Sequence, residues 1–423
     1  MFHVEKLNLK FARAMNKVPE GDIGVAVSGG SDSLALLHLG ADWAQKNRRT
    51  LKVATIDHRL RPESIAESQY VKKISTRLSI EHTTLTWLEK PSGNIQKLAR
   101  DARHRLLKNW STEKNLSVVL LGHTLEDNAE TIMIRLIRGS GVDGLVGISQ
   151  YKKINNLVIF RPLLQIKREE LRTYLIDKKI SWIDDPSNFD ERFQRVKVRQ
   201  LMPHLADLGL TISKINDFAE HMKRAKVALD SEVINFAISN VEQKFWGDLE
   251  IQQDAFIELP NEFQLRLLSL SLRWISGNFY RPRFKSLKIL LDLIIKDQSI
   301  AGFTLMGCLV KCRRKKIVFT REFSAIPKRQ KICKTTFVWD KKWNVRVDKS
   351  KINHFMVGPL GKDGVSQIKK ENIVDIPFYA LNSSIALFEN GDVKCVPMLS
   401  FGSGLNVELI GGADSFFNFL TTY

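Results

Sequence analysis

The stretch VAVSGGSDSLALLHL, residues 25–39, gives the clearest indication of the fold in the N-terminal part of the chain. Its first four residues have the apolar character of a buried strand, and its last part is an apolar run with helical spacing. A glycine-serine turn joins the two. Such a turn presents backbone N–H groups and the positive end of a helix dipole, which together favour a phosphate group. The stretch therefore predicts a strand, a turn and a helix that bind an anion.

The turn differs from two well-known phosphate-binding loops. A Walker A loop needs a lysine before its Ser or Thr, and a dinucleotide-binding turn needs a third glycine. In this chain Gly29 and Gly30 are followed by Ser31, Asp32 and Ser33. The loop therefore offers hydroxyl groups and backbone amides in place of a lysine.

Alternating strands and helices follow the first turn. The pattern predicts buried strands over residues 51–60 and 116–123, and helices over residues 64–78 and 94–114. Strands that alternate with helices indicate an α/β domain with a parallel, doubly wound sheet, similar to a Rossmann fold. In such a sheet the polar residues at the carboxyl ends of the strands line the ligand crevice. We therefore expect Ser28, Asp57 and His123 to lie close together.

The charge balance favours a protein that binds a polyanionic partner. The alternative is a protein whose basic composition reflects no such partner. The 423 residues include 65 Lys and Arg against 46 Asp and Glu, a formal net charge of +19. Residues 311–351 alone hold 15 basic and three acidic residues. Because the positive charge is concentrated in one region, nucleic acid is the favoured partner.

Cysteine usage and hydropathy favour a cytoplasmic protein. No run approaches the about 18 apolar residues of a membrane span, so no membrane partner is expected. Four cysteines in a chain of this length do not make a disulfide framework, which favours a reducing compartment. Cys308 and Cys312 have no matching pair or nearby histidine, so zinc is not expected.

The pattern changes twice along the chain. Helical stretches are expected over residues 213–245, 262–276 and 283–295. From about residue 303 short apolar strands alternate with Gly, Pro and basic clusters. We therefore predict a catalytic α/β domain over residues 1–210, a helical domain over 211–300 and a small basic α+β domain over 301–423.

An acidic segment follows the strand that ends near His123. In GHTLEDNAETIMIRLIRGSG, residues 122–141, His123, Asp127 and Glu130 are spaced by four and then by three. On a helix this spacing places all three on one face. Such a set binds a metal, acts as acid and base, or holds a cationic ligand; the alternative is a solvated helix face. The position beside the loop favours a ligand.

Six motifs in order resemble one known family. SGGSDS (28–33) is similar to the pyrophosphate loop of the PP-loop superfamily, the N-type ATP pyrophosphatases. Together with five further motifs it resembles the tRNA(Ile)-lysidine synthetase family: DHRLRPES (57–64), GHTLEDNAET (122–131), RGSGVDGLVGI (138–148), RPLL (161–164) and DDPSN (184–188). The resemblance is dense over residues 20–200 and thinner beyond them.

The resemblance implies a two-step reaction on RNA. ATP adenylates the C2 oxygen of the wobble cytidine, position 34, in the CAU anticodon of tRNA(Ile), and pyrophosphate leaves. The amine of free L-lysine then displaces AMP, and the lysidine formed pairs with A instead of G, which changes the identity of the tRNA from Met to Ile. ATP and Mg²⁺ are the implied cofactors, and a homodimer is a possible assembly.

The resemblance also implies roles for residues that match its motifs. The ATP-binding candidates are Ser28, Gly29, Gly30, Ser31, Asp32, Ser33, Asp57 and His58, with Asp32 as the Mg²⁺ ligand. The catalytic candidates are Asp32, His123, Asp127, Glu130 and Arg195. Asp127 and Glu130 are also the candidates for the lysine site. Arg103, Arg195 and Arg199 are the candidates for contacts with tRNA or phosphate.

The chain departs from the family pattern at three positions. Glu126 stands where the family commonly has the first of two aspartates, Asn128 replaces a glutamine, and Val196 replaces an asparagine between Arg195 and Arg199. The roles of Glu126 and Val196 are therefore open at this point.

Three other functions fit part of the pattern. A tRNA thiolase of the same superfamily needs cysteines near the loop, yet all four cysteines lie beyond residue 300. A small-molecule amide ligase has no use for the basic C-terminal region. An RNA-binding protein with a degenerate nucleotide site does not need Asp32, His123 and the carboxylates together. ATP–pyrophosphate exchange with and without tRNA separates these functions.

Overall fold

The computed structural model describes residues 2–59, 63–89, 95–154, 157–184, 190–278, 280–296, 300–369, 371 and 376–422. Its contacts divide the chain into two compact units, Met1–Lys226 and Val227–Tyr423. Helix α9 (Ile212–Asn240) contains the boundary between them. The three domains predicted from the sequence stay a prediction.

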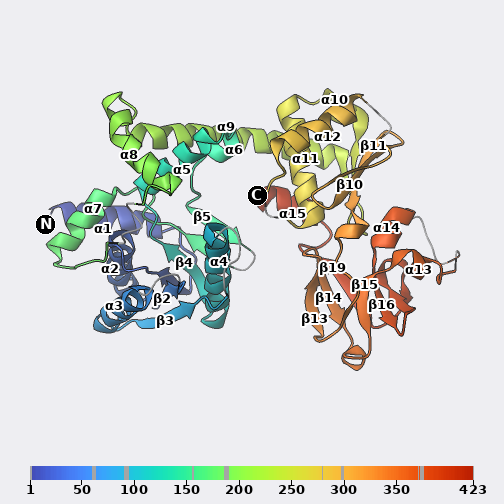
Figure 1. Ribbon diagram of the computed structural model, residues 1–423, viewed down its shortest axis with the longest axis horizontal. Coiled ribbons are helices and arrows are strands. Elements are labelled where there is room, and N and C mark those ends of the chain that lie inside the picture. The colour runs from blue at the N-terminus through green and yellow to red at the C-terminus, as the bar shows by residue number, and fades with distance from the viewer. Residues whose placement is uncertain are drawn as a thin grey trace. The chain divides into compact units, whose positions relative to one another are not determined.

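A six-stranded sheet forms the centre of the first unit, in the order β3-β2-β1-β4-β6-β5. Figure 1 labels four of its strands, β2, β3, β4 and β5. All neighbours pair in parallel except β5 and β6, which form an antiparallel hairpin at one edge. The strands are β1 (Asp22–Ala26), β2 (Leu51–Asp57), β3 (Glu81–Thr86), β4 (Leu116–Leu121), β5 (Tyr151–Ile154) and β6 (Leu157–Phe160). The predicted parallel α/β sheet is confirmed, and the edge hairpin is an addition to it.

Helices cover both faces of this sheet. They are α1 (Phe2–Met15), α2 (Ser31–Lys46), α3 (Glu63–Arg77), α4 (Ile95–Glu113) and α7 (Arg168–Asp177). Because side chains alternate along a strand, one face packs Val25 and Leu120 with α1, α2, α3 and α7, and the other packs Val119 with Trp110 of α4. A Cβ at Gly24 would lie 2.6 Å from the Trp110 ring, so glycine lets α4 approach β1.

A smaller helical layer adjoins the sheet in the first unit. It consists of α5 (Leu125–Ile137), α6 (Val142–Leu145), α8 (Gln194–Asp207) and the first part of α9. Ala129, Ile132, Val198 and Ile215 share its buried core. This packing fixes the direction in which α5 and α8 present their polar side chains.

The second unit begins with a helical part built on an antiparallel sheet of order β7-β8-β11-β10-β9. Its elements are β7 (Val241–Gln243), β8 (Leu249–Gln252), α10 (Gln253–Glu258), α11 (Asn261–Ser276), α12 (Phe284–Lys296), β9 (Phe303–Leu305), β10 (Cys308–Arg313), β11 (Lys316–Arg321) and α15 (Ser415–Thr422). Phe256, Leu268, Phe319 and Phe416 share one core. The sequence-predicted boundary at residue 300 lies inside this core.

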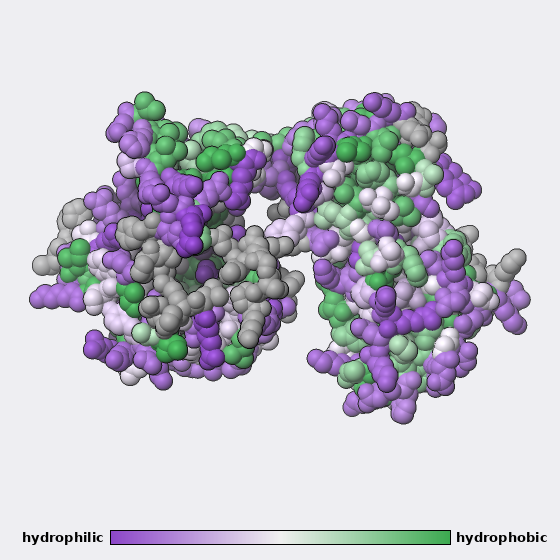
Figure 2. All heavy atoms as spheres, in the orientation of Figure 1, coloured by the Kyte–Doolittle hydropathy of each residue, from purple (hydrophilic) through white to green (hydrophobic). Residues whose placement is uncertain are grey.

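Two further antiparallel sheets complete the second unit, in the orders β12-β15-β16-β17-β18 and β13-β14-β19. Their strands are β12 (Gln330–Lys331), β13 (Thr336–Trp339), β14 (Trp343–Val347), β15 (Met356–Pro359), β16 (Ile385–Glu389), β17 (Asp392–Val396), β18 (Phe401–Gly402) and β19 (Leu405–Leu409). Short helices connect them: η2 (Phe323–Ala325), η3 (Lys349–Lys351), α13 (Gly361–Val365), α14 (Phe378–Ser383) and η5 (Pro397–Leu399). Hydrophilic residues gather along the lower edge of this part (Figure 2).

Most of the predicted helices are observed close to their expected ranges. The helix expected over residues 213–245 ends at Asn240, because residues 241–243 form β7 and pair with β8. None of the helices in the described ranges is long and apolar enough to cross a membrane.

Candidate active site at the carboxyl ends of the strands

The glycine-serine turn between β1 and α2 has the backbone of an anion-binding loop. Gly29 has φ of +91°, a conformation that favours glycine, and its carbonyl accepts a hydrogen bond from Ile183 N–H at 3.0 Å. Ser33 Oγ accepts from Ser28 N–H at 3.2 Å and donates to Gly30 O at 2.9 Å. The first N–H groups of α2 have no acceptor within the helix, so the fixed loop presents them to a ligand.

Adjacent strand ends bring further polar residues next to the loop. β2, β1 and β4 are neighbours. Asp57 is the last residue of β2, and Ser28 and His123 come shortly after β1 and β4, so all three stand at one edge of the sheet. Gly122 is the contact point, because a Cβ there would lie 3.2 Å from the Asp32 carbonyl oxygen. Glycine therefore lets the end of β4 pack directly against the first turn of α2.

The prediction that His123 shares a helix face with Asp127 and Glu130 is wrong for His123. Helix α5 begins at Leu125, and Thr124 is its extended N-cap residue. Thr124 N–H donates to Asp127 Oδ2 at 2.9 Å, and Asp127 N–H donates to Thr124 Oγ1 at 3.4 Å. This capping box stops the helix before His123, which lies in the link from β4.

Two of the three carboxylates on α5, those of Asp127 and Glu130, are bound by arginine side chains. Asp127 Oδ1 accepts from Arg168 Nη2 at 3.2 Å. The Glu130 carboxylate is almost fully buried, and it lies 2.8 Å from Arg199 Nε and 3.1 Å from Arg195 Nε. Arg195 and Arg199 are one helical turn apart on α8, so both reach the same carboxylate. Glu130 thus holds the two arginines that the sequence assigned to phosphate or tRNA.

Arg168 joins the loop to α5, and sequence reasoning missed it. Its Nε donates to Asp32 Oδ2 at 2.9 Å, and its Nη1 lies 3.9 Å from Glu130 Oε1. Although burial acts to lower it, Asp32 and Asp127 raise the pKa of the Arg168 guanidinium above its ordinary value. The available signal was its position shortly after the RPLL motif, at the start of a helix.

Arg168 acts to lower the pKa of the two carboxylates that it contacts, Asp32 and Asp127. Burial raises the pKa of Asp32, and the charge of Arg168 opposes that shift. Burial acts in the same direction on Asp127, but Arg168 and Arg195 hold the pKa of Asp127 below its ordinary value. The cation beside these carboxylates therefore favours their charged form.

The departures from the family pattern have structural roles. Glu126 Oε2 accepts from Arg168 N–H at 2.9 Å, so Glu126 binds the N-terminus of α7. Asn128 Nδ2 donates to Asn216 Oδ1 at 2.7 Å, which ties α5 to α9. Val196 is 6% exposed and packs in the interior.

His123 contacts a buried arginine that follows β6. Arg161 Nε donates to His123 Nδ1 at 3.3 Å. Burial, followed by the charge of Arg161, lowers the pKa of His123 to about 4. The imidazole is therefore neutral at physiological pH.

Asp57 is the last residue of β2, and His58 follows it. Asp57 Oδ1 accepts from Arg59 N–H at 2.9 Å and from Ser64 Oγ at 2.8 Å, so this carboxylate holds the link to α3. His58 packs edge-to-face on Trp87 with ring centroids 5.9 Å apart. Burial and the charge of Arg103 lower the pKa of His58 to about 4.

Arg103 lies on α4 and is exposed. Its charge acts on both His58 and His123, so it belongs to the same neighbourhood. Of the DDPSN motif, Asp184 accepts from Trp182 Nε1 at 3.1 Å, and residues 185–188 lie outside the described residues.

The side chains available as metal ligands indicate how Mg²⁺ could bind at the loop. Among the described residues, no group of three or more His, Cys, Asp or Glu side chains is arranged to hold a metal ion. Mg²⁺ in nucleotide sites commonly takes one or two carboxylates and completes its shell with phosphate oxygens and water. The half-buried Asp32 carboxylate beside the loop fits that mode of binding.

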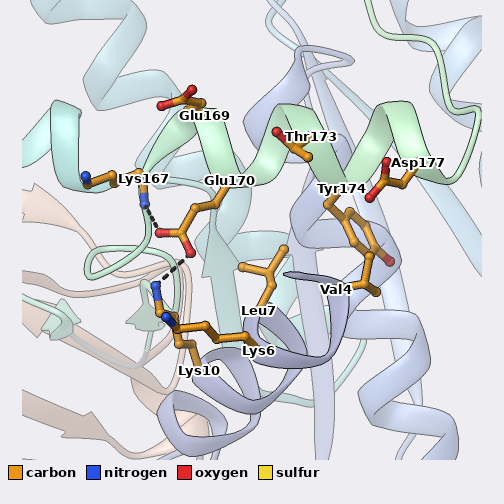
Figure 3. Close-up of a pocket in the computed structure, with 10 residues that line it drawn as sticks. All are labelled: Val4, Lys6, Leu7, Lys10, Lys167, Glu169, Glu170, Thr173, Tyr174 and Asp177. Atoms are coloured by element: carbon orange, nitrogen blue, oxygen red, sulfur yellow. Dashed lines mark hydrogen bonds and ion pairs between the residues drawn. The ribbon is translucent and has the colours of Figure 1, made fainter. Parts of the chain in front are cut away.

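A separate cavity of about 460 Å³ lies between α1 and α7. Figure 3 shows Glu170 between the Lys10 ammonium and the start of α7, and Tyr174 beside Val4. Lys10 Nζ lies 2.7 Å from Glu170 Oε2. These contacts hold α1 against the helix whose first residue is Arg168.

Known proteins resemble this chain over most of its length. Residues 3–205 match the model of the PP-loop domain family. The tRNA(Ile)-lysidine synthase of Ruegeria pomeroyi is 34% identical over 406 residues, which cover 96% of this chain and 95% of that protein. The tRNA(Ile)-lysidine synthase of Wolbachia pipientis wMel is 37% identical over 76% of each chain.

Among solved structures, a U34-tRNA thiolase from Methanococcus maripaludis with its [4Fe-4S] cluster has a TM-score of 0.47 and 16% identity, over 52% of this chain and 78% of that one. The identity to the curated relatives extends well beyond the PP-loop domain and covers nearly the whole of the Ruegeria protein. The chain therefore belongs to the tRNA(Ile)-lysidine synthase family.

Proposed function

We propose that this chain joins free L-lysine to C2 of the wobble cytidine in the CAU anticodon of tRNA(Ile), with ATP converted to AMP and pyrophosphate. The observation that carries the proposal is the anion-binding loop beside a cluster of carboxylates and arginines, in a chain related to lysidine synthases over 96% of its length. The cytidine is activated first and receives the amine second.

In the first step the cytidine O2 attacks the α-phosphorus of ATP. A bond from O2 to phosphorus forms, the bond from this phosphorus to the bridging oxygen breaks, and pyrophosphate leaves. The loop amides and the hydroxyls of Ser28, Ser31 and Ser33 would bind the departing pyrophosphate. Arg195 and Arg199, held by Glu130, would stabilise charge on the phosphoryl group.

The proposed Mg²⁺ would be held by Asp32 together with phosphate oxygens. The ion would neutralise charge on the leaving pyrophosphate. Arg168 lies 2.9 Å from Asp32 Oδ2 and competes for the same carboxylate. We therefore expect Arg168 and Mg²⁺ to share the negative charge of Asp32 and Asp127.

In the second step the neutral lysine amine attacks C2 and gives up a proton, and the bond from C2 to the adenylate oxygen breaks as AMP leaves. Asp127 and Glu130 are the proposed site for the lysine ammonium. Their negative charge and burial support that role, since an ammonium needs a carboxylate partner when it leaves water. A lysine there would share these carboxylates with Arg168, Arg195 and Arg199.

A tRNA thiolase is the weaker alternative. All four cysteines lie in the second unit, where Cys308, Cys312 and Cys395 are buried. Sulfur transfer needs accessible thiolates at the nucleotide site, and the described loop and strand ends hold none. The homodimer and the cytoplasmic location expected from the sequence stay predictions.

Nucleoside analysis tests the proposed function. The full chain is incubated with ATP, Mg²⁺, labelled lysine and a tRNA(Ile) transcript with the CAU anticodon, and the digested RNA is examined by mass spectrometry. We expect a lysine adduct of cytidine that requires ATP and is absent from a transcript with uridine at the wobble position. Label recovered on the uridine transcript, or none on either with folded protein, would contradict the proposal.

A further inference from the structure

Two adjacent strands bring an arginine against His123. Val119 and Leu120 of β4 pair with Ile159 and Phe160 of β6. Arg161 follows β6 directly, and His123 follows β4 by two residues, so both side chains belong to the same edge of the sheet. The result is the contact of 3.3 Å from Arg161 Nε to His123 Nδ1.

The Arg161 guanidinium is fixed by its surroundings. The residue is 7% exposed, and its Nη1 donates to the Ser149 carbonyl at 2.8 Å. Its backbone N–H donates to the Gln150 carbonyl at 2.9 Å. Burial lowers the pKa of Arg161 to about 10, which still leaves the group charged at neutral pH. It is therefore a permanent donor in one position.

This donor determines the state of the imidazole. A guanidinium has no acceptor atom, so His123 Nδ1 must accept with its lone pair. An imidazolium would place an N–H against the Arg161 N–H. The proton of the neutral ring is therefore on Nε2, which leaves that edge as a hydrogen-bond donor.

Most of the other charged groups around His123 also lower the pKa of its ring. Arg195 from α8 and Arg103 from α4 add positive charge, and Asp127 from α5 is the opposing carboxylate. Three arginines, with Arg161 included, thus oppose a positive charge on the ring. A neutral His123 is not a proton acceptor through Nδ1, since that atom is already bonded.

We propose that Arg161 is a positioning residue that holds His123 as the neutral ring with its hydrogen on Nε2, so that His123 acts as a hydrogen-bond donor and not as a general base. The acceptor is an oxygen of the bound nucleotide or of the cytidine. The identity of that acceptor rests on the proposed function, whereas the state of the ring does not.

Histidine hydrogen–deuterium exchange at ring C2, read by mass spectrometry on the full chain, tests the state of the ring without activity. We expect the pKa of His123 to be well below the ordinary value of about 6.5 in the wild-type chain and to rise toward that value in Arg161→Met. His58 is the internal reference, since burial and the charge of Arg103 lower its pKa and Arg161 is not among the causes. A His123 pKa near the ordinary value in the wild-type chain, or one unchanged by Arg161→Met, would overturn the proposal.

Arg135→Met is the matched control variant. Arg135 Nη1 donates to the carbonyls of Gly144 and Gly147, both at 2.8 Å. Arg135→Met therefore also removes a guanidinium that binds the backbone, as Arg161→Met does. Arg135 has no contact with His123 among the described residues. We expect Arg135→Met to leave the His123 pKa unchanged, whereas an equal rise in both variants would show a merely structural effect.

The pH profile of tRNA adenylation gives a second readout. In Arg161→Met the neutral ring is free to move its proton to Nδ1, but the imidazolium always carries one on Nε2. Relative to wild type, we expect the adenylation rate of Arg161→Met to be about tenfold lower at pH 8, with a smaller difference toward pH 6. Arg161→Lys should restore part of the adenylation rate. A loss equal at all pH values would count against the proposal. If wild-type protein lacks adenylation, the proposed function fails, and the exchange result still decides the state of His123.

Discussion

Glu130 lies within 3.9 Å of three arginine side chains of the site. Its buried carboxylate contacts Arg195 and Arg199 and lies 3.9 Å from Arg168. Sequence spacing predicted that Asp127 and Glu130 project from one helix near the loop, and the structure places them so. The arginine partners could not be predicted, because α8 and α7 lie far along the chain and the choice of partner depends on packing.

Glu130→Gln tests whether this carboxylate organises arginines or binds lysine. Removal of its charge releases Arg195 and Arg199, so we expect tRNA adenylation to fall by about a hundredfold. Single-turnover assays with labelled ATP, followed by labelled lysine, measure the two steps separately. Normal adenylation with a raised KM for lysine would instead assign Glu130 to lysine alone.

Asp32→Ala addresses the candidate metal ligand. The carboxylate faces Arg168 and the loop, so its loss should reduce adenylation by at least about a hundredfold and leave tRNA affinity within a few fold. Filter binding measures the affinity and pyrophosphate release the chemistry. Comparable activity in the variant at saturating Mg²⁺ would exclude Asp32 as the ligand.

At the scale of elements, the start of α7 determines where Arg168 lies. Glu126 accepts from the Arg168 N–H at 2.9 Å, and the contacts of Lys10 and Glu170 hold α1 against the same helix. The sequence predicted the strand, turn and helix of the loop because local glycine and apolar spacing encode them. It did not predict the β5–β6 hairpin or the capping role of Glu126, which depend on tertiary contacts.

Substitutions at Glu126 test this helix cap. Glu126→Gln keeps an oxygen acceptor and should retain most activity, whereas Glu126→Ala loses the cap, worth about 1 kcal/mol. We expect Glu126→Ala to lower the melting temperature of the protein by about 2–4 °C and adenylation by about tenfold. Equal behaviour of the two variants in calorimetry and adenylation would argue against the cap.

At the scale of the molecule, the basic segment 311–351 is only partly available to a partner. Lys342 is buried, and Arg321 forms an ion pair of 2.6 Å with Asp340. Lys331, Lys334, Arg346 and Lys349 are among those exposed to solvent. Composition predicted a basic region, but it could not separate the cations that stabilise the fold from those that face solvent.

Neutralisation of exposed cations tests the region for tRNA binding. Changing Lys331, Lys334, Arg346 and Lys349 to Gln should weaken tRNA binding and reduce its salt dependence by ~0.9 in log–log slope for each lost phosphate contact. Lys315→Gln with Lys394→Gln is the control, since both lysines have acidic partners. Binding assays over a salt series give the slopes, and equal slopes in all three proteins would refute the role. A truncation at residue 300 is less suitable because it divides a core.

The fate of AMP in the absence of lysine shows whether the cytidine is adenylated before the amine attacks. The wild-type chain is mixed with tRNA(Ile) and ATP labelled at the α-phosphate, and RNA-bound label is measured before and after addition of lysine. We predict that AMP joins the RNA without lysine, with pyrophosphate released, and that lysine then releases AMP as lysidine forms. AMP transferred to lysine in the absence of tRNA would contradict activation of the cytidine as the first step.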